Sequence, residues 1–284
     1  MSSASPTKRL TPANFSPSGK GIWDWLRPFF TSSIGAKATT AVTGMALTGF
    51  VIAHLVGNLK IFAGRDALNE YAAFLQSFGP LLWVARIGLL VVFVLHLYLA
   101  LSLKRRSVLA RPVKYQFERT IQAPVSSKIM PWTGAVILLF VLFHLAHFTF
   151  GWVSTTMATE KTSLKLVEAN YLEITDQSGL RDVYTMVIHG FSNPVIAILY
   201  LVAQVFLFLH LQHGIASVFQ TLGLNTPRIQ PTIRKIALGI AGLILLGNSA
   251  IVVAVWTGQM EEYGKGVYVH KPETVQMISV PSKN

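Results

Sequence analysis

Histidine dominates the possible chemistry of this sequence. Of its 8 histidines, only His270 lies in a polar terminal segment, and it is given no role. The others lie in or beside long apolar stretches: His54, His96, His144, His147, His189, His210 and His213. Ionisable side chains are rare in such stretches and are usually functional there. Because the chain has no cysteine, thiolate and iron–sulfur ligation within it are excluded, and a bound metal needs histidine, carboxylate or methionine.

The composition is that of an integral membrane protein. The chain is 52% hydrophobic and 13% charged, with a mean hydropathy of +0.50, whereas soluble chains are about 25% charged. A net charge of +12 would favour nucleic-acid binding in a soluble protein. Here the basic residues lie beside apolar runs, where they set membrane orientation instead.

Five apolar runs are long enough to cross a bilayer, which takes about 20 residues. We expect spans near 38–62, 81–103, 130–152, 187–216 and 235–257, and hence an all-α, five-helix integral membrane bundle over 38–258. Residues 1–37 are expected to form a tail without a signal peptide and an interfacial segment over 21–30. Residues 259–284 are expected to form a second tail, and no inverted repeat typical of transporters is seen.

Charge predicts the orientation of the five spans. With the N-terminus inside, the inner segments carry twice as many Lys and Arg as the outer ones, and only 2 of the 12 acidic residues, Asp24 and Glu118. The strongest inner signal is KRRSVLARPVK, 104–114. The positive-inside rule therefore predicts a cytoplasmic N-terminus and an outer C-terminus.

Depth along the spans then sorts the histidines into two layers. At 1.5 Å per residue, His54 and either His144 or His147 lie in the outer half, whereas His96 and either His210 or His213 lie in the inner half. Two facing imidazoles in each layer suit two six-coordinate b haems, while zinc needs three or four ligands. Gly44, Gly49 and Gly57 in the first span would let a flat ring approach the backbone, although close helix packing also uses glycine.

The second histidine of each close pair lies nearer its own membrane surface. We therefore expect His144 and His210 to be ligands, and His147 and His213 to lie at the haem edge or near its propionates. Depth alone leaves the opposite assignment open.

The pattern resembles the diheme cytochrome b subunit of succinate dehydrogenase and fumarate reductase, the five-helix cytochrome b558 family. The resemblance covers most of residues 30–258 and is carried by FVIAHLVGN, GRDALNEYAAFL, VVFVLHLYLAL, WTGAVILLFVLFH and FLFLHLQHG with LGLNTPR. It implies one axial histidine in each of the first four spans. By local context these are His54 with His144 for the distal haem, and His96 with His210 for the proximal haem.

The resemblance also implies a function. Electrons would pass from an iron–sulfur subunit, docked with a flavoprotein subunit on the cytoplasmic face, through both haems to a quinone, which we expect to be menaquinone. The reverse reaction, quinol:fumarate reduction, uses the same parts. Two family features differ here: Phe208 stands where some members have a glutamate, and Gln76 where members tend to have an acidic residue near the quinone site.

Further candidate residues follow from their positions in this scheme. Candidates near the haem edges or propionates are His147, His213, Ser33, Lys37, Gly44, Arg86 and Arg105. Candidates for the quinone site are Glu70, Gln76, His189 and Asn193.

Two other readings of the histidines are weaker. The cytochrome b of quinol:cytochrome c oxidoreductases has two histidines per helix about four turns apart, and no span here shows that spacing. The cytochrome b of formate dehydrogenases and hydrogenases would receive its electrons on the outer side of the membrane. A transporter using the histidines as a proton relay lacks a reason for two paired layers. Such a transporter would also be colourless.

Overall fold

The computed structural model describes residues 21–110, 125–153, 174–176, 178–260, 268–271 and 274–277. The tail expected over 1–20 and most of the C-terminal tail lie outside these residues. So do most of residues 153–186, which connect the third and fourth expected spans. In chain order the elements are α1 (Ile22–Thr31), α2 (Ser33–Asn58), η1 (Leu59–Ala63), α3 (Arg65–Ser77), α4 (Pro80–Leu109), α5 (Val125–His144), η2 (Leu145–Thr149), β1 (Ile174–Thr175), α6 (Val183–Ser192), α7 (Pro194–Thr221), α8 (Gln230–Trp256), β2 (Tyr268–Lys271) and β3 (Thr274–Met277).

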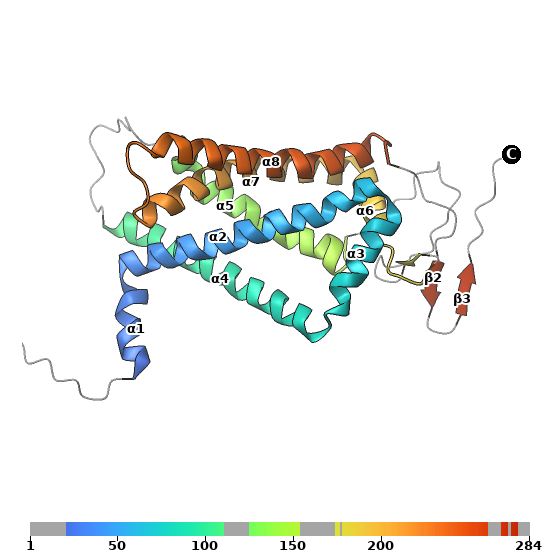
Figure 1. Ribbon diagram of the computed structural model, residues 1–284, viewed down its shortest axis with the longest axis horizontal. Helices are drawn as coiled ribbons and strands as arrows, with labels where there is room; N and C mark the ends of the chain where they lie inside the picture. Colours follow the sequence, from blue (N-terminus) through green and yellow to red (C-terminus); the bar gives the residue numbers. More distant parts are fainter. Residues whose placement is uncertain are drawn as a thin grey trace, which may run out of the picture.

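The expected five-helix bundle is confirmed. Five helical segments are long and apolar enough to cross a membrane: Ser33–Ala63, Pro80–Leu109, Ser127–Thr149, Pro194–Thr221 and Gln230–Trp256 (Figure 1). Many of their apolar side chains face outward; on α4, for example, Trp83 and Leu90 are 62% and 59% exposed. A lipid environment accounts for such a surface, so the chain is a multi-pass membrane protein.

The fourth apolar run differs from the expected single span over 187–216. It is divided into α6 and α7 at Asn193, whose backbone is extended and whose side chain accepts hydrogen bonds from the N–H groups of Val195 and Ile196. The following Pro194 disfavours a helical conformation at Asn193 and starts α7 at its first turn. His189 therefore lies on a separate short helix and not on the long span.

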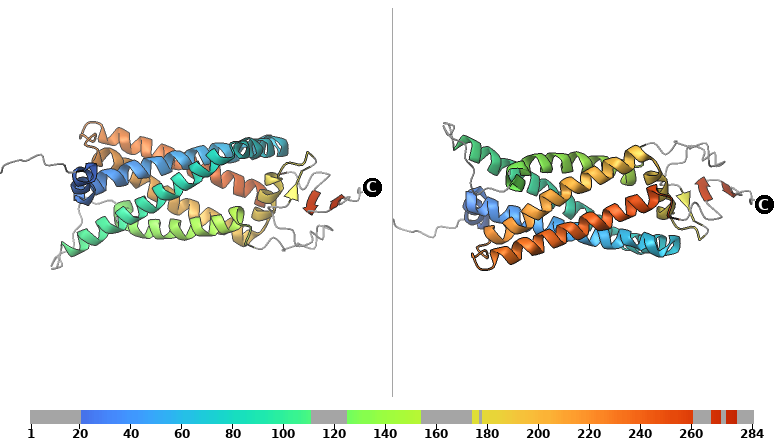
Figure 2. Two further views of the ribbon diagram at one scale, coloured as in Figure 1. Left: turned by 90° about the horizontal axis from the view of Figure 1, so that it is seen from below. Right: turned by 90° about the horizontal axis from the view of Figure 1, so that it is seen from above.

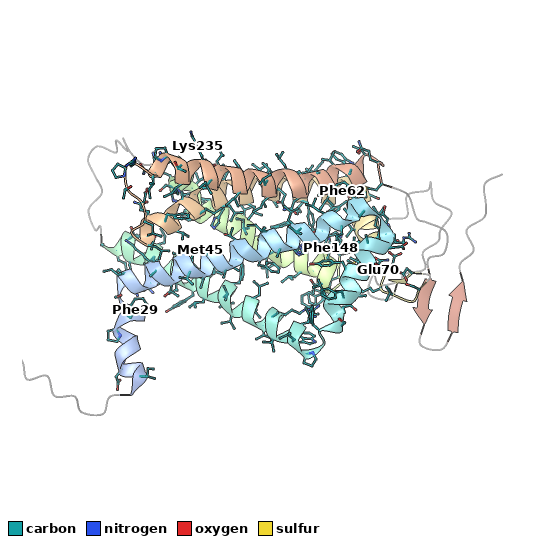
Figure 3. All side chains as sticks on the ribbon, in the orientation of Figure 1. Phe29, Met45, Phe62, Glu70, Phe148 and Lys235 are labelled. Carbon is teal, nitrogen blue, oxygen red and sulfur yellow. The ribbon has the colours of Figure 1, made fainter. Side chains whose placement is uncertain are left out.

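The two ends of the bundle are built differently (Figures 1 and 2). At one end α1 turns away from α2, and the side chain of Ser32 caps α2 by accepting a hydrogen bond from Gly35 N–H. We call this the α1 end; Phe29 and Lys235 lie there (Figure 3). At the other end η1, α3, α6 and the antiparallel sheet β1-β2-β3 gather; we call this the capped end, and Phe62 and Glu70 lie there.

The long helices pack unequally. α8 lies along α7, and α2 packs on both α4 and α7, while α5 packs on α7. The contacts run in the order α4, α2, α7, α5, and within the described residues α4 does not pack extensively on α5 or α7, nor α2 on α5. In this order α2 and α5, and α4 and α7, are the pairs that are not neighbours, and we call them the two diagonals. The buried apolar core lies between α2, α7 and α8 and includes Leu55, Ile244 and Val255.

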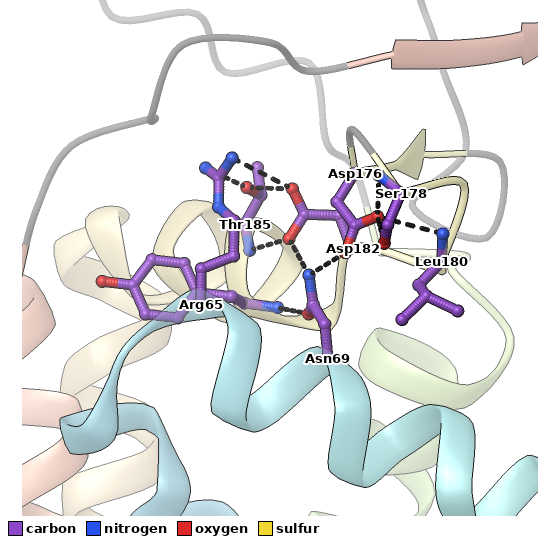
Figure 4. A network of polar contacts seen from close by, with 8 residues as sticks. Arg65, Asn69, Asp176, Ser178, Leu180, Asp182 and Thr185 are labelled. Atoms are coloured by element: carbon purple, nitrogen blue, oxygen red, sulfur yellow. Dashed lines mark hydrogen bonds and ion pairs between the residues drawn. The ribbon is translucent and has the colours of Figure 1, made fainter.

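A buried polar network holds the capped end together (Figure 4). Asn69 of α3 is fully buried and donates from Nδ2 to Asp176 and Asp182, 3.0 and 3.2 Å away, while its Oδ1 accepts from Tyr184 N–H. Asp182 caps α6 by accepting from the N–H and the hydroxyl of Thr185. This network ties the segment after α2 to the helix that leads into α7.

Arg65 and Asp176 are the charged side chains at the edges of this network. The Arg65 guanidinium lies 3.8 Å from Asp182 Oδ2 and donates to the Thr185 hydroxyl. Burial alone raises the pKa of Asp176, but hydrogen bonds from Ser178, Asn69 and Leu180 N–H outweigh it and hold this pKa below its ordinary value. The network therefore favours the carboxylate form of Asp176.

Candidate cofactor sites between the helices

The first candidate site joins α2 to α5 across one diagonal of the bundle. The imidazole rings of His54 and His144 have centroids 5.9 Å apart and planes at 88° to each other. Two metal–nitrogen bonds of about 2.0–2.1 Å on opposite sides of one ion, with the rings beyond them, separate such centroids by about 6 Å. The two rings therefore have the spacing of a pair of axial ligands.

Each histidine of this pair is flanked by a phenylalanine one turn earlier on its own helix. Phe50 stacks on His54 with centroids 5.5 Å apart, and Phe140 lies 5.9 Å from His144. The neighbouring rings are apolar and restrict the orientation of the imidazoles. The pair is thus held by packing as well as by its helices.

The second candidate site joins α4 to α7 across the other diagonal. His210 lies close enough to His96 for their charges to interact. Nδ1 of His96 is 3.1 Å from the Thr43 hydroxyl and 3.2 Å from the Thr40 carbonyl oxygen, and Nδ1 of His210 is 3.1 Å from the Thr133 hydroxyl. Metal-binding histidines usually engage their second nitrogen in this way, which fixes the tautomer and leaves Nε2 for the metal.

Glycines follow both threonines and give these imidazoles room. A Cβ on Gly44 would lie 3.1 Å from His96 Cε1, closer than is comfortable, and a Cβ on Gly134 would lie 3.6 Å from His210 Cε1. Gly44, a candidate from the sequence, therefore lies directly against a histidine ring. A Cβ on Gly49 would meet nothing within 4 Å.

The two sites are built from equivalent residues of two similar helix pairs. TGMALTGFVIAHL in α2 and TGAVILLFVLFHL in α5 share Thr-Gly, Phe-Val and His-Leu at the same spacing. The threonine of each helix contacts a histidine of the next long helix: Thr43 contacts His96, and Thr133 contacts His210. The phenylalanine of each helix packs against the histidine of its own helix, which is His54 in α2 and His144 in α5. Sequence reasoning missed Thr43 and Thr133, although this parallel repeat was a signal that could have found them.

The repeat also sets the distance between the two levels. His54 follows Thr43 by eleven residues, and His144 follows Thr133 by the same number. At 1.5 Å per residue, these positions are about 16 Å apart along each helix. The His54–His144 pair lies toward the capped end and the His96–His210 pair toward the α1 end.

His147 takes a different position from His144. It is fully buried in the π-helical turn η2, against Phe148 at a centroid distance of 4.0 Å. A Cβ on Gly190 of α6 would lie 3.0 Å from its ring. The ring is thus packed toward α6, and its neighbour His189 lies close enough for their charges to interact. Among the described residues, the imidazole that faces His54 is that of His144.

The remaining haem-edge candidates divide between the two ends. His213 is close to His210 but bonds through Nε2 to the Ser217 hydroxyl one turn along α7. Ser33, Lys37 and Arg105 are exposed toward the α1 end, and within the described residues they make no hydrogen bond to the histidines.

Arg86 is at the capped end, with its guanidinium 5.0 Å from the centre of the Trp83 ring. Burial, and then the positive charge of Arg86, lower the pKa of Arg181. Sequence reasoning did not identify Arg181.

The quinone candidates do not gather in one place. Glu70 lines a cleft of ≈ 880 Å³ at the capped end together with Asp66, Asp176 and Tyr184, but Gln76, His189 and Asn193 do not line it. Gln76 is exposed near the end of α3, and the Asn193 side chain caps α7. Of the four, His189 is the one whose charge is close enough to interact with His147.

Comparison with models of known protein families, with curated proteins and with solved structures finds no match for this chain. The geometry of the histidine pairs and the residues that hold them are therefore the observations that bear on function.

Proposed function

We propose that this chain is the membrane-anchoring cytochrome b subunit of a succinate:quinone oxidoreductase. His54 with His144, and His96 with His210, would each hold one b haem. The observation that carries the proposal is the pairing of the His54 and His144 imidazoles, whose centroids are 5.9 Å apart, with His96 and His210 each held by a threonine at a second level of the bundle. The donor set fits: two imidazoles per site are the axial ligands of a six-coordinate b haem.

The protein residues have defined tasks in this proposal. Thr43 and Thr133 would fix the neutral tautomer of His96 and His210 through Nδ1 and so leave Nε2 available to the metal. Phe50 and Phe140 keep water from the imidazoles at the other site. When bound, the haems would supply one-electron carriers at two depths of the membrane, and the oxidation of succinate would belong to the flavoprotein subunit.

The proposed orientation places the α1 end in the cytoplasm. The exposed basic residues at the end of α4, Lys104 and Arg105, lie on that side and offer a surface for the iron–sulfur partner. The flavoprotein subunit would follow beyond it, and the quinone would be reduced toward the capped end. The location would be a bacterial cytoplasmic membrane.

Two levels about 16 Å apart cover half of a hydrocarbon core of about 30 Å. An electron moved through the membrane is subject to about 2.3 kcal/mol per 100 mV of membrane potential. Reduction of a low-potential quinone such as menaquinone would thus depend on the membrane potential, and fumarate reduction is the same path in reverse.

The test of this function is the electron donor. In membranes that contain the whole complex, succinate is expected to reduce the b haems of this chain, as seen in a succinate-reduced minus oxidised spectrum. Dithionite provides the control for total haem. Haem that dithionite reduces, but that neither succinate nor a reduced quinol reduces, would contradict the assignment and favour a cytochrome b with another donor.

Gly44 gives a prediction about the His96–His210 site. Gly44→Ala places a methyl group against the His96 ring and should displace it by a few tenths of an ångström, which we expect to weaken haem retention there about tenfold. Haem per chain after detergent dilution measures this. The matched variants Gly134→Ala and Gly49→Ala meet ordinary contact or open space, so equal losses in all three would contradict a role for the His96 contact.

A further inference from the structure

Tyr200 of α7 bridges the two neighbouring histidines of the capped half of the bundle. Its hydroxyl oxygen lies 3.2 Å from Nδ1 of His144 and 3.0 Å from Nδ1 of His147. We propose that Tyr200 is a positioning residue for His144: it accepts a hydrogen bond from this ligand, donates one to His147, and so lowers the reduction potential of the haem at the His54–His144 site. This inference rests on the proposed function.

The position of Tyr200 is fixed by aromatic packing. Its side chain is 4% exposed. Its ring centre lies 5.0 Å from that of Phe140 and 4.8 Å from that of Phe191, in edge-to-face arrangements. The hydroxyl is thus held at a defined point between the two imidazoles.

The direction of each hydrogen bond follows from the ligand role of His144. If Nε2 of His144 binds iron as a neutral imidazole, its Nδ1 carries the proton and donates to the tyrosine oxygen. The tyrosine hydroxyl can then donate its single proton to Nδ1 of His147. His147 then carries its own proton on Nε2. A single hydroxyl thus gives His144 and His147 opposite tautomers, with the proton on Nδ1 in His144 and on Nε2 in His147.

The sequence indicates that this arrangement exists in one half of the bundle. Tyr200 precedes His210 by ten residues, and the residue ten positions before His96 is Arg86. His147 follows His144 by three residues, and the residue three positions after His54 is Gly57. Among the described residues, none forms a hydrogen bond with a ring nitrogen of His54. The His54–His144 site therefore has one ligand tuned through Nδ1, whereas both ligands of the His96–His210 site meet a threonine.

The expected consequence is electronic. An acceptor at Nδ1 makes the imidazole a stronger electron donor to the metal and favours the oxidised state. Donation by the same hydroxyl to His147 polarises it further and strengthens its interaction with His144. Removing the hydroxyl should therefore favour reduction at this site and leave the other site unchanged.

The experiment is a redox titration of the purified complex with Tyr200→Phe and, as matched control, Thr133→Val. Tyr200→Phe is expected to retain two haems and raise the reduction equilibrium constant of one haem by up to about tenfold, which is 59 mV for a one-electron couple. Thr133→Val should move the other haem instead. Low-spin ferric electron paramagnetic resonance signals give a second readout of which ligand field changed.

A further variant keeps the test decisive if Tyr200→Phe loses haem. His147→Ala removes the acceptor of the tyrosine proton and should shift the same haem in the same direction by a smaller amount. Unchanged potentials in both variants, or equal shifts of both haems, would overturn the role of Tyr200. A wild-type complex without haem would instead overturn the proposed function, so the two failures are distinguishable.

Discussion

Replacing His144 with alanine is expected to remove one of the two proposed haems from the protein, whereas His147→Ala keeps both. The reason is geometric: the His144 ring faces His54 at 5.9 Å, while His147 is buried against Phe148 and the backbone of Gly190. A six-coordinate haem cannot be held by His54 alone. A pyridine haemochrome assay on purified protein measures the haem content of each variant.

His54→Ala provides the matched control, since it removes the opposite ligand of the same site. It should cause the same loss as His144→Ala, and the haem that remains should have the same spectrum in both variants. Loss in His147→Ala with retention in His144→Ala would keep two haems but reverse the ligand assignment.

Asp182→Ala is expected to produce the largest loss of stability among single changes at the capped end. Asp182 is fully buried, caps α6, and meets Asn69, Thr185 and Arg65. Its removal leaves these donors without their carboxylate, for a cost of about 2–4 kcal/mol. Thermal denaturation of the purified protein in detergent, followed by circular dichroism, should show a lower midpoint.

Asp66→Ala is the control for this prediction because it removes the same charge from an exposed position of α3. Its effect should stay within about 0.5 kcal/mol. If the two variants shift the midpoint equally, the buried network does not stabilise the capped end in the way described.

The sequence predicted the helices well because the membrane imposes a length and a hydropathy on each of them. It failed at the start of the fourth span, where one apolar run over 187–216 contains a helix boundary. Asn193 and Pro194 are a cap and a first-turn residue. Since both also occur inside apolar runs of membrane helices, hydropathy alone did not locate the break.

The site was predictable only in part. Depth along the spans placed His54 and His144 at one level, but two histidines one turn apart were not separable by depth. Their difference depends on the π-helical turn that carries His147 and on its packing against α6. Tyr200 and the Asn69–Asp182 contact join residues more than 50 and more than 100 positions apart, which no local pattern specifies.

The most direct test of the account is the number and type of haems in the wild-type protein. A pyridine haemochrome assay with a reduced-minus-oxidised spectrum, on protein purified under conditions that retain cofactors, should give two b haems per chain. A colourless protein would contradict the account and would turn attention to the histidines as a proton relay.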